Sequence, residues 1–257
     1  MRKRVLAVAS TAVLIGLAGC GQASDSAAGG TPAVSATTAA PADPVARLKA
    51  STKEIEAGNY RFEFKGGPLS GKGYVHKPTK GTKLDMNYDD PNFKISAELW
   101  VVDTATMVRL TRGGQPVGGG GKWMKLDLAK AKDSELLEYI APVDVPGAAQ
   151  VLATATDVVE KDGALTGMVD LAKPQGVPTI DENLLDQISR SVNRVPFSAT
   201  LDDQGRLAKL VLDLVGPSAG HLSTLDFTYT DYGTVTPEAA PGATEAVDAP
   251  ADFYDEL

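Results

Sequence analysis

Apolar and charged side chains alternate along much of the chain. Tyr60, Phe62 and Phe64, for example, are separated by charged residues. The same two-residue period is found in the stretches 83–88, 93–101 and 195–201, and less regularly in 69–76, 106–111, 122–128, 157–161, 164–171, 206–215 and 222–232. Successive side chains of a strand point to opposite faces, so this period predicts β-strands with one apolar face. Asp162-Gly163, between two of these stretches, is typical of a two-residue hairpin turn, and the pattern predicts a run of antiparallel hairpins.

Helical signals separate some of the predicted strands. Asp43 can cap a helix in which Pro44 suits the first turn and Gly58 ends the last. The apolar stripe of this helix consists of Val45, Leu48, Thr52 and Ile55. Two shorter helices are expected over residues 133–141 and 146–152.

The last helical signal is a capping box, Thr179–Glu182. In such a box the side chains of the first and fourth residues each accept a hydrogen bond from the backbone N–H of the other. Leu184, Ile188 and Val192 follow it at positions i, i+4 and i+8. Such stripes must be buried against a sheet, and most connections between the strands are too short for parallel crossovers. The predicted fold class is therefore α+β, a curved antiparallel half-barrel sheet covered by a few α-helices.

The first twenty residues have the form of a signal segment. A basic start, Met1–Arg4, precedes the apolar run Val5–Leu17, which as a helix rises about 20 Å and is shorter than the ~30 Å hydrocarbon core of a membrane. Leu17–Cys20 then resembles the lipobox of bacterial lipoproteins. That resemblance implies a lipoprotein signal peptide over residues 1–19, a lipid anchor on Cys20, and a position on the extracytoplasmic face of the cell membrane. An ordinary secretory signal with a chance cysteine is the alternative.

Composition divides the rest of the chain into three parts. Residues 20–43 are almost entirely Ala, Ser, Thr, Gly and Pro, and we expect a flexible lipidated tether with a typical reach of about 26 Å. Residues 44–232 hold the strand and helix signals and form the predicted half-barrel domain for lipid binding. Residues 233–257 are an acidic tail rich in Pro and Ala, which we expect to be loosely held.

Charge and residue counts narrow the classes of function. The chain has 25 basic and 33 acidic residues, and its net charge of −8 becomes −11 once Arg2, Lys3 and Arg4 leave with the signal peptide. No stretch concentrates Lys and Arg, which argues against binding of nucleic acid through its phosphates. With one cysteine and two histidines, the chain has neither an internal disulfide nor the ligands of a Cys- and His-rich metal centre.

Short motifs match catalytic or metal-binding patterns only in part. Gly66–Gly73 resembles a phosphate loop, but it lacks the Ser or Thr that binds Mg²⁺ and lies between strands. Gly216–Gly220 matches GxSxG, yet a strand instead of a helix is expected after it. Asp85–Asp90 resembles the start of a calcium loop without its Gly and Glu. Gly118–Gly121 is expected to be a mobile loop near a cavity mouth. We predict no catalytic residue, no metal site and no cofactor.

Taken together, these features resemble one family. The lipobox, the tether, and a late strand–turn–strand from Val195 through Asp202–Gly205 to Leu207 are similar to the LppX/LprG lipoproteins of actinobacteria, whose fold is similar to that of the carriers LolA and LolB. The resemblance covers about residues 44–232. It implies an open half-barrel with an apolar cavity under its helices, and a carrier of acylated lipid or glycolipid that is not an enzyme.

No catalytic or ligand residue of the family is carried over to this chain, and the candidate residues come from the strand and helix patterns and from the lipobox. The candidate wall of the cavity consists of Phe62, Phe64, Leu184, Ile188 and Val192, and the lipid anchor is Cys20. The partners are the membrane, through the anchor, an acyl lipid or glycolipid ligand, and a lipid transporter.

Two other functions stay open at this point. The stretch Leu207–Val215 is apolar on both strand faces, so its second face requires a cover of helix, lipid or partner. If helices alone supply that cover, the core is solid, and the chain is a structural or regulatory lipoprotein that docks an envelope partner without a ligand. A hydrolase is the other alternative, and no triad, metal cluster or acid pair supports it.

Overall fold

The computed structural model describes residues 43–103, 105–131, 144–173, 192–214 and 223–255. The chain divides into two compact units, Met1–Ala40 and Pro41–Leu257, and all described residues belong to the second. The expected signal peptide and the tether as far as residue 42 lie outside the described residues. So do the helix expected over 133–141, the helix with the capping box, and the GxSxG match.

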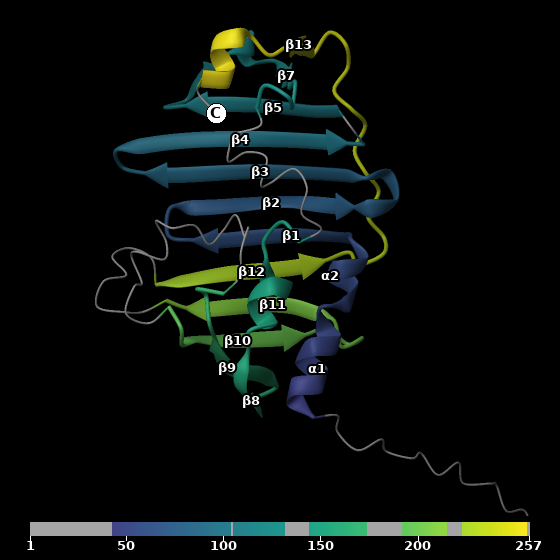
Figure 1. Cartoon of the computed structure of the whole chain (residues 1–257), viewed down its shortest axis with the longest axis vertical. Coiled ribbons are helices and arrows are strands. Elements are labelled where there is room, and N and C mark those ends of the chain that lie inside the picture. The colour runs from purple at the N-terminus through teal and green to yellow at the C-terminus, as the bar shows by residue number, and fades with distance from the viewer. Residues whose placement is uncertain (1–42, 104, 132–143, 174–191, 215–222, 256–257) are drawn as a thin grey trace, which may run out of the picture. The chain divides into compact units, whose positions relative to one another are not determined.

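The described strands form one open, mostly antiparallel sheet (Figure 1). Its order is β13-β7-β5-β4-β3-β2-β1-β12-β11-β10-β9-β8, and β6 pairs with β5, which makes 13 strands in the described part of the chain. The strands are β1 (Asn59–Gly66), β2 (Leu69–His76), β3 (Gly81–Asp90), β4 (Phe93–Val102), β5 (Ala105–Arg112), β6 (Gln115–Val117), β7 (Trp123–Lys125), β8 (Thr156–Lys161), β9 (Ala164–Val169), β10 (Val195–Leu201), β11 (Leu207–Asp213), β12 (Thr224–Thr230) and β13 (Ala246–Asp248). The expected antiparallel hairpins are confirmed, and the pair β13–β7 is parallel.

The described helices are short. They are α1 (Pro44–Ser51), α2 (Lys53–Ala57) and α3 (Ala148–Leu152), with the 3₁₀ helices η1 (Lys77–Thr79), η2 (Gly119–Gly121) and η4 (Ala251–Asp255). The cap expected for α1 is confirmed, because a carboxylate oxygen of Asp43 accepts the Ala46 N–H at 3.1 Å. The expected stripe is wrong at Val45, which is 52% exposed. The buried face of α1 passes instead through Leu48 and Ser51, and Val45 lies to one side of it.

Strand pairing puts apolar side chains of neighbouring strands on the same face of the sheet, which we call the inner face. One row across the strands from β12 to β4 consists of Tyr229, Phe62, Gly73, Leu84 and Leu99. The adjacent row, on the opposite or outer face, consists of Thr228, Glu63, Lys72, Asp85 and Glu98. The two-residue period of the sequence therefore correctly predicts the faces of β1, β3 and β4. Residues 85–90, which resemble the start of a calcium loop in sequence, belong to strand β3.

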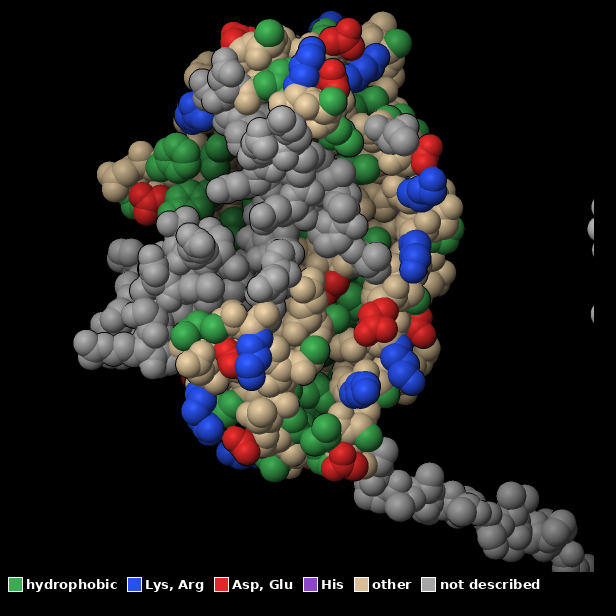
Figure 2. Space-filling model, viewed as in Figure 1, with side chains coloured by type: hydrophobic (Ala, Val, Ile, Leu, Met, Phe, Trp, Pro, Cys, Tyr) green, Lys and Arg blue, Asp and Glu red, His purple; other side chains and the backbone are tan. Residues whose placement is uncertain are grey.

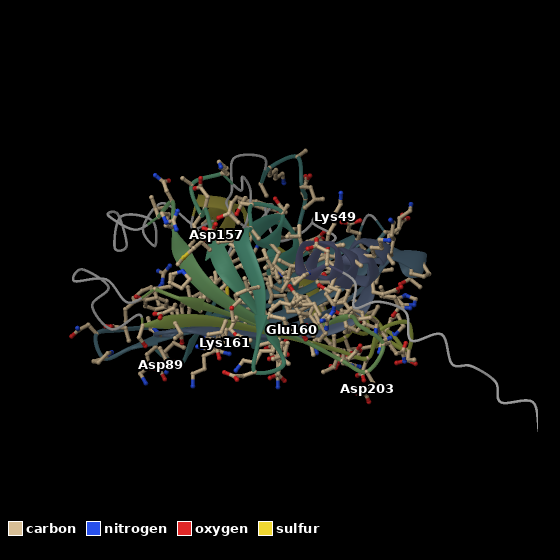
Figure 3. All side chains as sticks on the ribbon, turned by 90° about the horizontal axis from the view of Figure 1, so that it is seen from below. Lys49, Asp89, Asp157, Glu160, Lys161 and Asp203 are labelled. Atoms are coloured by element: carbon tan, nitrogen blue, oxygen red, sulfur yellow. The ribbon has the colours of Figure 1, made fainter. Side chains whose placement is uncertain are left out.

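The sheet curves at its β8 edge. Strands β9 and β8 rise out of the plane of the other strands, toward the side that carries α1 (Figure 3). A register shift between Thr156 and Val159 marks an irregularity in β8, and bulges of this kind increase the local twist of a strand. Arg47 of α1 and Glu160 of β8 form an ion pair at 2.6 Å, so the first helix and the edge strand meet on the same side of the sheet.

The main hydrophobic core lies on the inner face. Its largest cluster joins the inner side chains of β1, β9, β10, β11 and β12 to Leu48 of α1, Ile55 of α2 and Val151 of α3. Figure 1 shows these three helices in front of the half of the sheet formed by β1 and β12 to β8. The expectation that β11 is apolar on both faces is wrong, because Lys209 and Asp213 are exposed on its outer side while Leu210 and Leu212 are buried.

The acidic tail is attached to the sheet, contrary to our expectation that it is loosely held. Its strand β13 pairs in parallel with β7, and the Trp123 N–H donates to the Glu245 carbonyl at 3.0 Å. Phe253 of η4 is 3% exposed and packs with Met124. The tail is held because it contributes backbone donors and acceptors to an edge strand and one aromatic ring to the core, and composition shows neither.

Three phenylalanines of the inner face lie opposite glycines of the neighbouring strand. The pairs are Phe62 with Gly73, Phe64 with Gly71 and Phe197 with Gly167. A Cβ atom at Gly71 would overlap the ring of Phe64, and one at Gly167 would lie 2.9 Å from a ring atom of Phe197. Gly71 and Gly73, two of the glycines in the stretch that resembles a phosphate loop, therefore have a packing role, since they make room for rings that lie across the adjacent strand.

We predict that Gly71→Ala lowers the free energy of unfolding by about 1–3 kcal/mol, because the added methyl group overpacks the Phe64 ring. Urea unfolding of the single variants Gly71→Ala and Phe64→Leu and of the double variant measures this effect. The double variant should lose less stability than the sum of the two single losses, because each change relieves the other. Strictly additive losses would contradict this account of the pair.

Candidate functional site

The inner face of the sheet is the candidate site, because it carries side chains expected to line a lipid cavity. Strand β1 places Phe62 and Phe64 there, and they are 1% and 2% exposed. Their rings are stacked, with centroids 6.4 Å apart and 13° between the planes. Tyr229 and Phe227 of β12 lie opposite these rings in the pairing register. Phe62 and Phe64 therefore belong to the packed centre of the inner face.

Val192 is the third expected wall residue that the structure describes. It is half-buried and packs against the same hydrophobic cluster. Its carbonyl accepts the Leu171 N–H at 2.8 Å, which holds it next to the end of β9. Leu184, Ile188 and the anchor Cys20 lie outside the described residues, so their roles stay predictions. The three described wall residues are thus brought together in one cluster.

Burial decreases along the inner faces of β3 and β4 toward the hairpin that joins them. Leu84 and Leu99 form a buried pair, and Met86 is half-buried. Tyr88 and Phe93, nearest the turn, are 37% and 47% exposed, with ring centroids 6.0 Å apart. Figure 1 shows none of α1, α2 and α3 in front of these two strands. The apolar inner face therefore extends from a packed centre to solvent at one end of the sheet.

A buried carboxylate interrupts the apolar centre. Asp144 is 7% exposed and accepts two hydrogen bonds, from the Tyr229 hydroxyl at 3.0 Å and from the Ala149 N–H at 2.6 Å. Tyr60 packs beside Tyr229, with ring centroids 5.4 Å apart. Because Ala149 lies in the first turn of α3, the carboxylate caps that helix and ties it to β12. These contacts give Asp144 a structural role.

Burial also changes the acidity of this cluster. Loss of solvent raises the pKa of Asp144 to about 6, and the hydrogen bonds from Ala149 and Tyr229 only partly oppose that rise. Burial, and then the nearby Asp144, raise the pKa of the Tyr229 hydroxyl well above its ordinary value. The tyrosine therefore stays a hydrogen-bond donor while Asp144 titrates.

The outer face is polar and hollowed over β12, β1, β2 and β3. Two adjacent hollows of about 580 and 460 Å³ share Glu63, Lys72 and Asp85 in their walls. The tail closes part of the larger hollow, because Glu238 accepts a 2.8 Å hydrogen bond from Lys83. The backbone N–H of Glu238 also donates to the Tyr74 hydroxyl at 3.0 Å. Charges of both signs meet here, so the outer face is an ion-paired surface and differs from the apolar wall predicted for a lipid.

Comparisons with known proteins do not assign this site. No protein-family model matches the chain, and no curated protein matches it. Among the described residues, no helix is both long enough and apolar enough to cross a membrane.

Sequence reasoning missed the buried Asp144 cluster and the exposed pair at the β3–β4 hairpin. A local signal for Asp144 was present, because an Asp shortly before Pro146-Gly147 is typical of a turn that leads into a helix cap. Its partner Tyr229 is 85 positions away in the chain, so only the fold brings the two side chains together. Tyr88 and Phe93 were assigned to strands correctly, but their exposure depends on what covers the end of the sheet.

We predict that Asp144→Asn removes a pH-dependent loss of stability. A folded-state pKa of about 6, above the ordinary value of 3.8 for Asp, means that the folded protein binds this proton more tightly than the unfolded chain does. The wild-type free energy of unfolding therefore falls as pH rises from about 4 to 6. Relative to the wild type, the Asn variant should gain about 2.5 kcal/mol between pH 4 and pH 7, at ~1.4 kcal/mol per pKa unit. Urea unfolding at several pH values measures this difference.

Asp202→Asn is the matched control with the opposite sign. Burial alone raises the pKa of Asp202, but hydrogen bonds from Arg206 and from the Gln204 N–H lower it overall. The wild type should therefore gain stability over this variant as pH rises through the acid range. A flat difference between wild type and Asp144→Asn from pH 4 to 7 would contradict the assignment of a raised pKa to Asp144.

Proposed function

We propose that this chain is a membrane-anchored lipoprotein that binds or carries acylated lipid or glycolipid on the outer side of the cytoplasmic membrane. The acyl chains lie along the inner face of β2, β3 and β4 and extend toward the β3–β4 hairpin. Binding involves no covalent chemistry. Cys20 is the site of the lipid anchor, and a lipid transporter of the envelope is the partner that supplies or receives the ligand.

One observation carries the proposal: the apolar inner face continues from the packed centre to solvent at Tyr88 and Phe93. Apolar surface in contact with water is unfavourable by about 25 cal/mol per Å², and each methylene group removed from water contributes ~0.8 kcal/mol. About ten buried methylene groups would supply ~8 kcal/mol, the free energy of a micromolar complex. A fatty acyl chain therefore matches this face in both chemistry and energy.

Membership of the LppX/LprG lipoproteins, with a half-barrel like that of LolA and LolB, is part of the same proposal. The open sheet, the curved β8 edge and the helices on one side support it. The late hairpin on which the resemblance rests is the β10–β11 pair, and its turn is held by Asp202, which accepts bonds from the Arg206 N–H at 3.0 Å and side chain at 2.7 Å.

A docking module without a ligand is the second candidate. It is favoured by the complete burial of Phe62 and Phe64, because side chains in contact with a ligand cavity need space beside them. In that case the inner face is a solid core, and an envelope partner binds elsewhere on the body. A cavity-filling substitution at a half-buried position of the inner face separates the two candidates.

We predict that Met86→Trp weakens binding of a fluorescent fatty-acyl probe at least tenfold, because the larger side chain fills space that the acyl chain needs. If the acyl cavity is open, the free energy of unfolding should change little, because the tryptophan enters free space. In a solid core the same change would overpack and lower the free energy of unfolding by about 1–3 kcal/mol. Probe titration and urea unfolding of the purified full chain measure both quantities.

Asn87→Trp is the matched control, because Asn87 is the next residue of β3 and is exposed on the outer face. It should leave probe binding and stability unchanged. A destabilised Met86→Trp variant, together with a wild type that binds no probe and releases no lipid in native mass spectrometry, would favour the docking module.

We also predict that Cys20→Ala leaves the precursor uncleaved and without a thioether-linked lipid, because Cys20 is the only cysteine in the chain. Intact-mass measurement of the protein from membrane and soluble fractions tests this. A Cys20→Ala protein of normal mature mass that stays in the membrane would overturn the lipobox assignment.

A further inference from the structure

An apolar rim lies at the end of the sheet where β1 joins β2 and β3 joins β4. Its residues are Leu69, Tyr88, Pro91, Phe93 and Ile95. Among the described residues, four large hydrophobic side chains are exposed, and Tyr88 and Phe93 are the two that lie together, whereas Val45 and Val159 belong to α1 and β8. Figure 2 shows hydrophobic side chains gathered at the left margin of the view, over the free end of this hairpin.

Charges next to the apolar rim are largely compensated. Lys94 and Asp89 form an ion pair at 2.6 Å, and Asp90 accepts the Asn92 N–H at 2.9 Å. A paired charge loses less favourable solvation than an isolated one when it approaches a medium of low dielectric constant. The hairpin can therefore be brought against an apolar phase at lower cost than an equally charged but unpaired turn.

The opposite ends of the strands have a different surface. Their turns carry the exposed ion pair of Lys80 with Asp103, at 2.6 Å, and the exposed Asp203. Figure 3 shows Asp89 and Asp203 at opposite ends of the sheet. The described part of the chain has no exposed large hydrophobic residue at those turns. The two ends of the sheet are thus distinct in chemistry, one apolar and one charged.

The chain that precedes the body is long enough to let either end face a membrane. Helix α1 begins at Pro44, and residues 20–43 would span typically about 26 Å and at most ~80 Å. A strand of ten residues is about 33 Å long. The tether therefore does not impose an orientation, and the difference between the two ends of the sheet decides which end meets lipid.

We infer that the apolar rim contacts the outer leaflet of the membrane and that acyl chains enter and leave the inner face there. Aromatic side chains such as Tyr and Phe are suited to the boundary between water and hydrocarbon. The rim continues into the inner face, because the Tyr88–Ile95 pair is followed on the same face by the pairs Met86–Ala97 and Leu84–Leu99. The entry of acyl chains rests on the proposed carrier function, whereas the membrane contact rests on the rim and the tether.

The test places an environment-sensitive nitrobenzoxadiazole label at either end of the sheet in the full chain. Asn92→Cys puts it beside the rim, and Asp203→Cys puts it at the charged end. Only the backbone N–H of Asn92 makes the bond to Asp90, so the substitution keeps it. Both proteins are reconstituted into vesicles of phosphatidylcholine and phosphatidylglycerol with nitroxides in the acyl chains. Any label on Cys20 is common to both variants and cancels in the comparison.

Severalfold stronger quenching of the label at 92 than at 203 is the expected result. Replacing Tyr88 and Phe93 by Ser should abolish that difference, whereas the control Val159→Ser, at another exposed apolar position, should leave it. Equal quenching at both ends, or stronger quenching at 203, overturns the inference. So does a blue shift of the label at 92 that depends on protein concentration without vesicles, since the rim then binds a second copy of this chain.

Acyl-probe measurements on the same proteins separate this inference from the proposed function. The Tyr88→Ser, Phe93→Ser double variant should slow probe transfer between vesicles severalfold, by a larger factor than it weakens equilibrium binding, because the rest of the inner face is retained. If the wild type binds no probe while the label at 92 is quenched, the carrier function and the entry route fail and the membrane contact stands. If the probe binds but the label at 92 is not quenched, the carrier function stands and the rim inference fails.

Discussion

Exclusion of one sheet face from water is the constraint on which the rest of the structure depends. A two-residue period repeated over many strands makes a single continuous apolar face, and that face is stable only when something covers it. Rings on β1 lie across glycines on β2, so the centre packs closely without a second sheet. At the β8 edge of the sheet, β8 and β9 curve toward α1, and the ion pair between Arg47 and Glu160 joins α1 to β8.

The buried Asp144 shows how the few helices of the described chain are fixed on this face. A five-residue helix such as α3 has little stability of its own, so its position must be set by tertiary contacts. Asp144 supplies them by binding both the first turn of α3 and the Tyr229 hydroxyl of β12. A charged group in the core is stabilising only when its hydrogen bonds are made, and its raised pKa reflects the burial that these bonds do not fully offset.

The proposed carrier function and the inferred membrane contact both depend on one gradient of burial along the inner face. The packed centre around Phe62 and Phe64 stabilises the sheet, and the exposed end at Tyr88 and Phe93 is where an apolar ligand would first contact the inner face. Over β12, β1, β2 and β3 the outer face shares neither property, because its hollows are lined by charges that pair across strands and with Glu238 of the tail. Under the proposed function, the ligand therefore binds to the inner face and the polar part of the outer face stays in water.

The sequence by itself determined the local features of this protein. The alternation in β1, β3 and β4, the hairpin turn at Asp162-Gly163 and the cap at Asp43 depend on neighbours in the chain, and each is present in the structure. Only the tertiary structure decided that the acidic tail adds a strand beside β7. It alone also decided that Asp144 meets Tyr229 and that Val45 is exposed. The physical reason is that burial and pairing between distant segments depend on which surfaces the folded chain brings together, and the periodicity of a single segment does not contain that information.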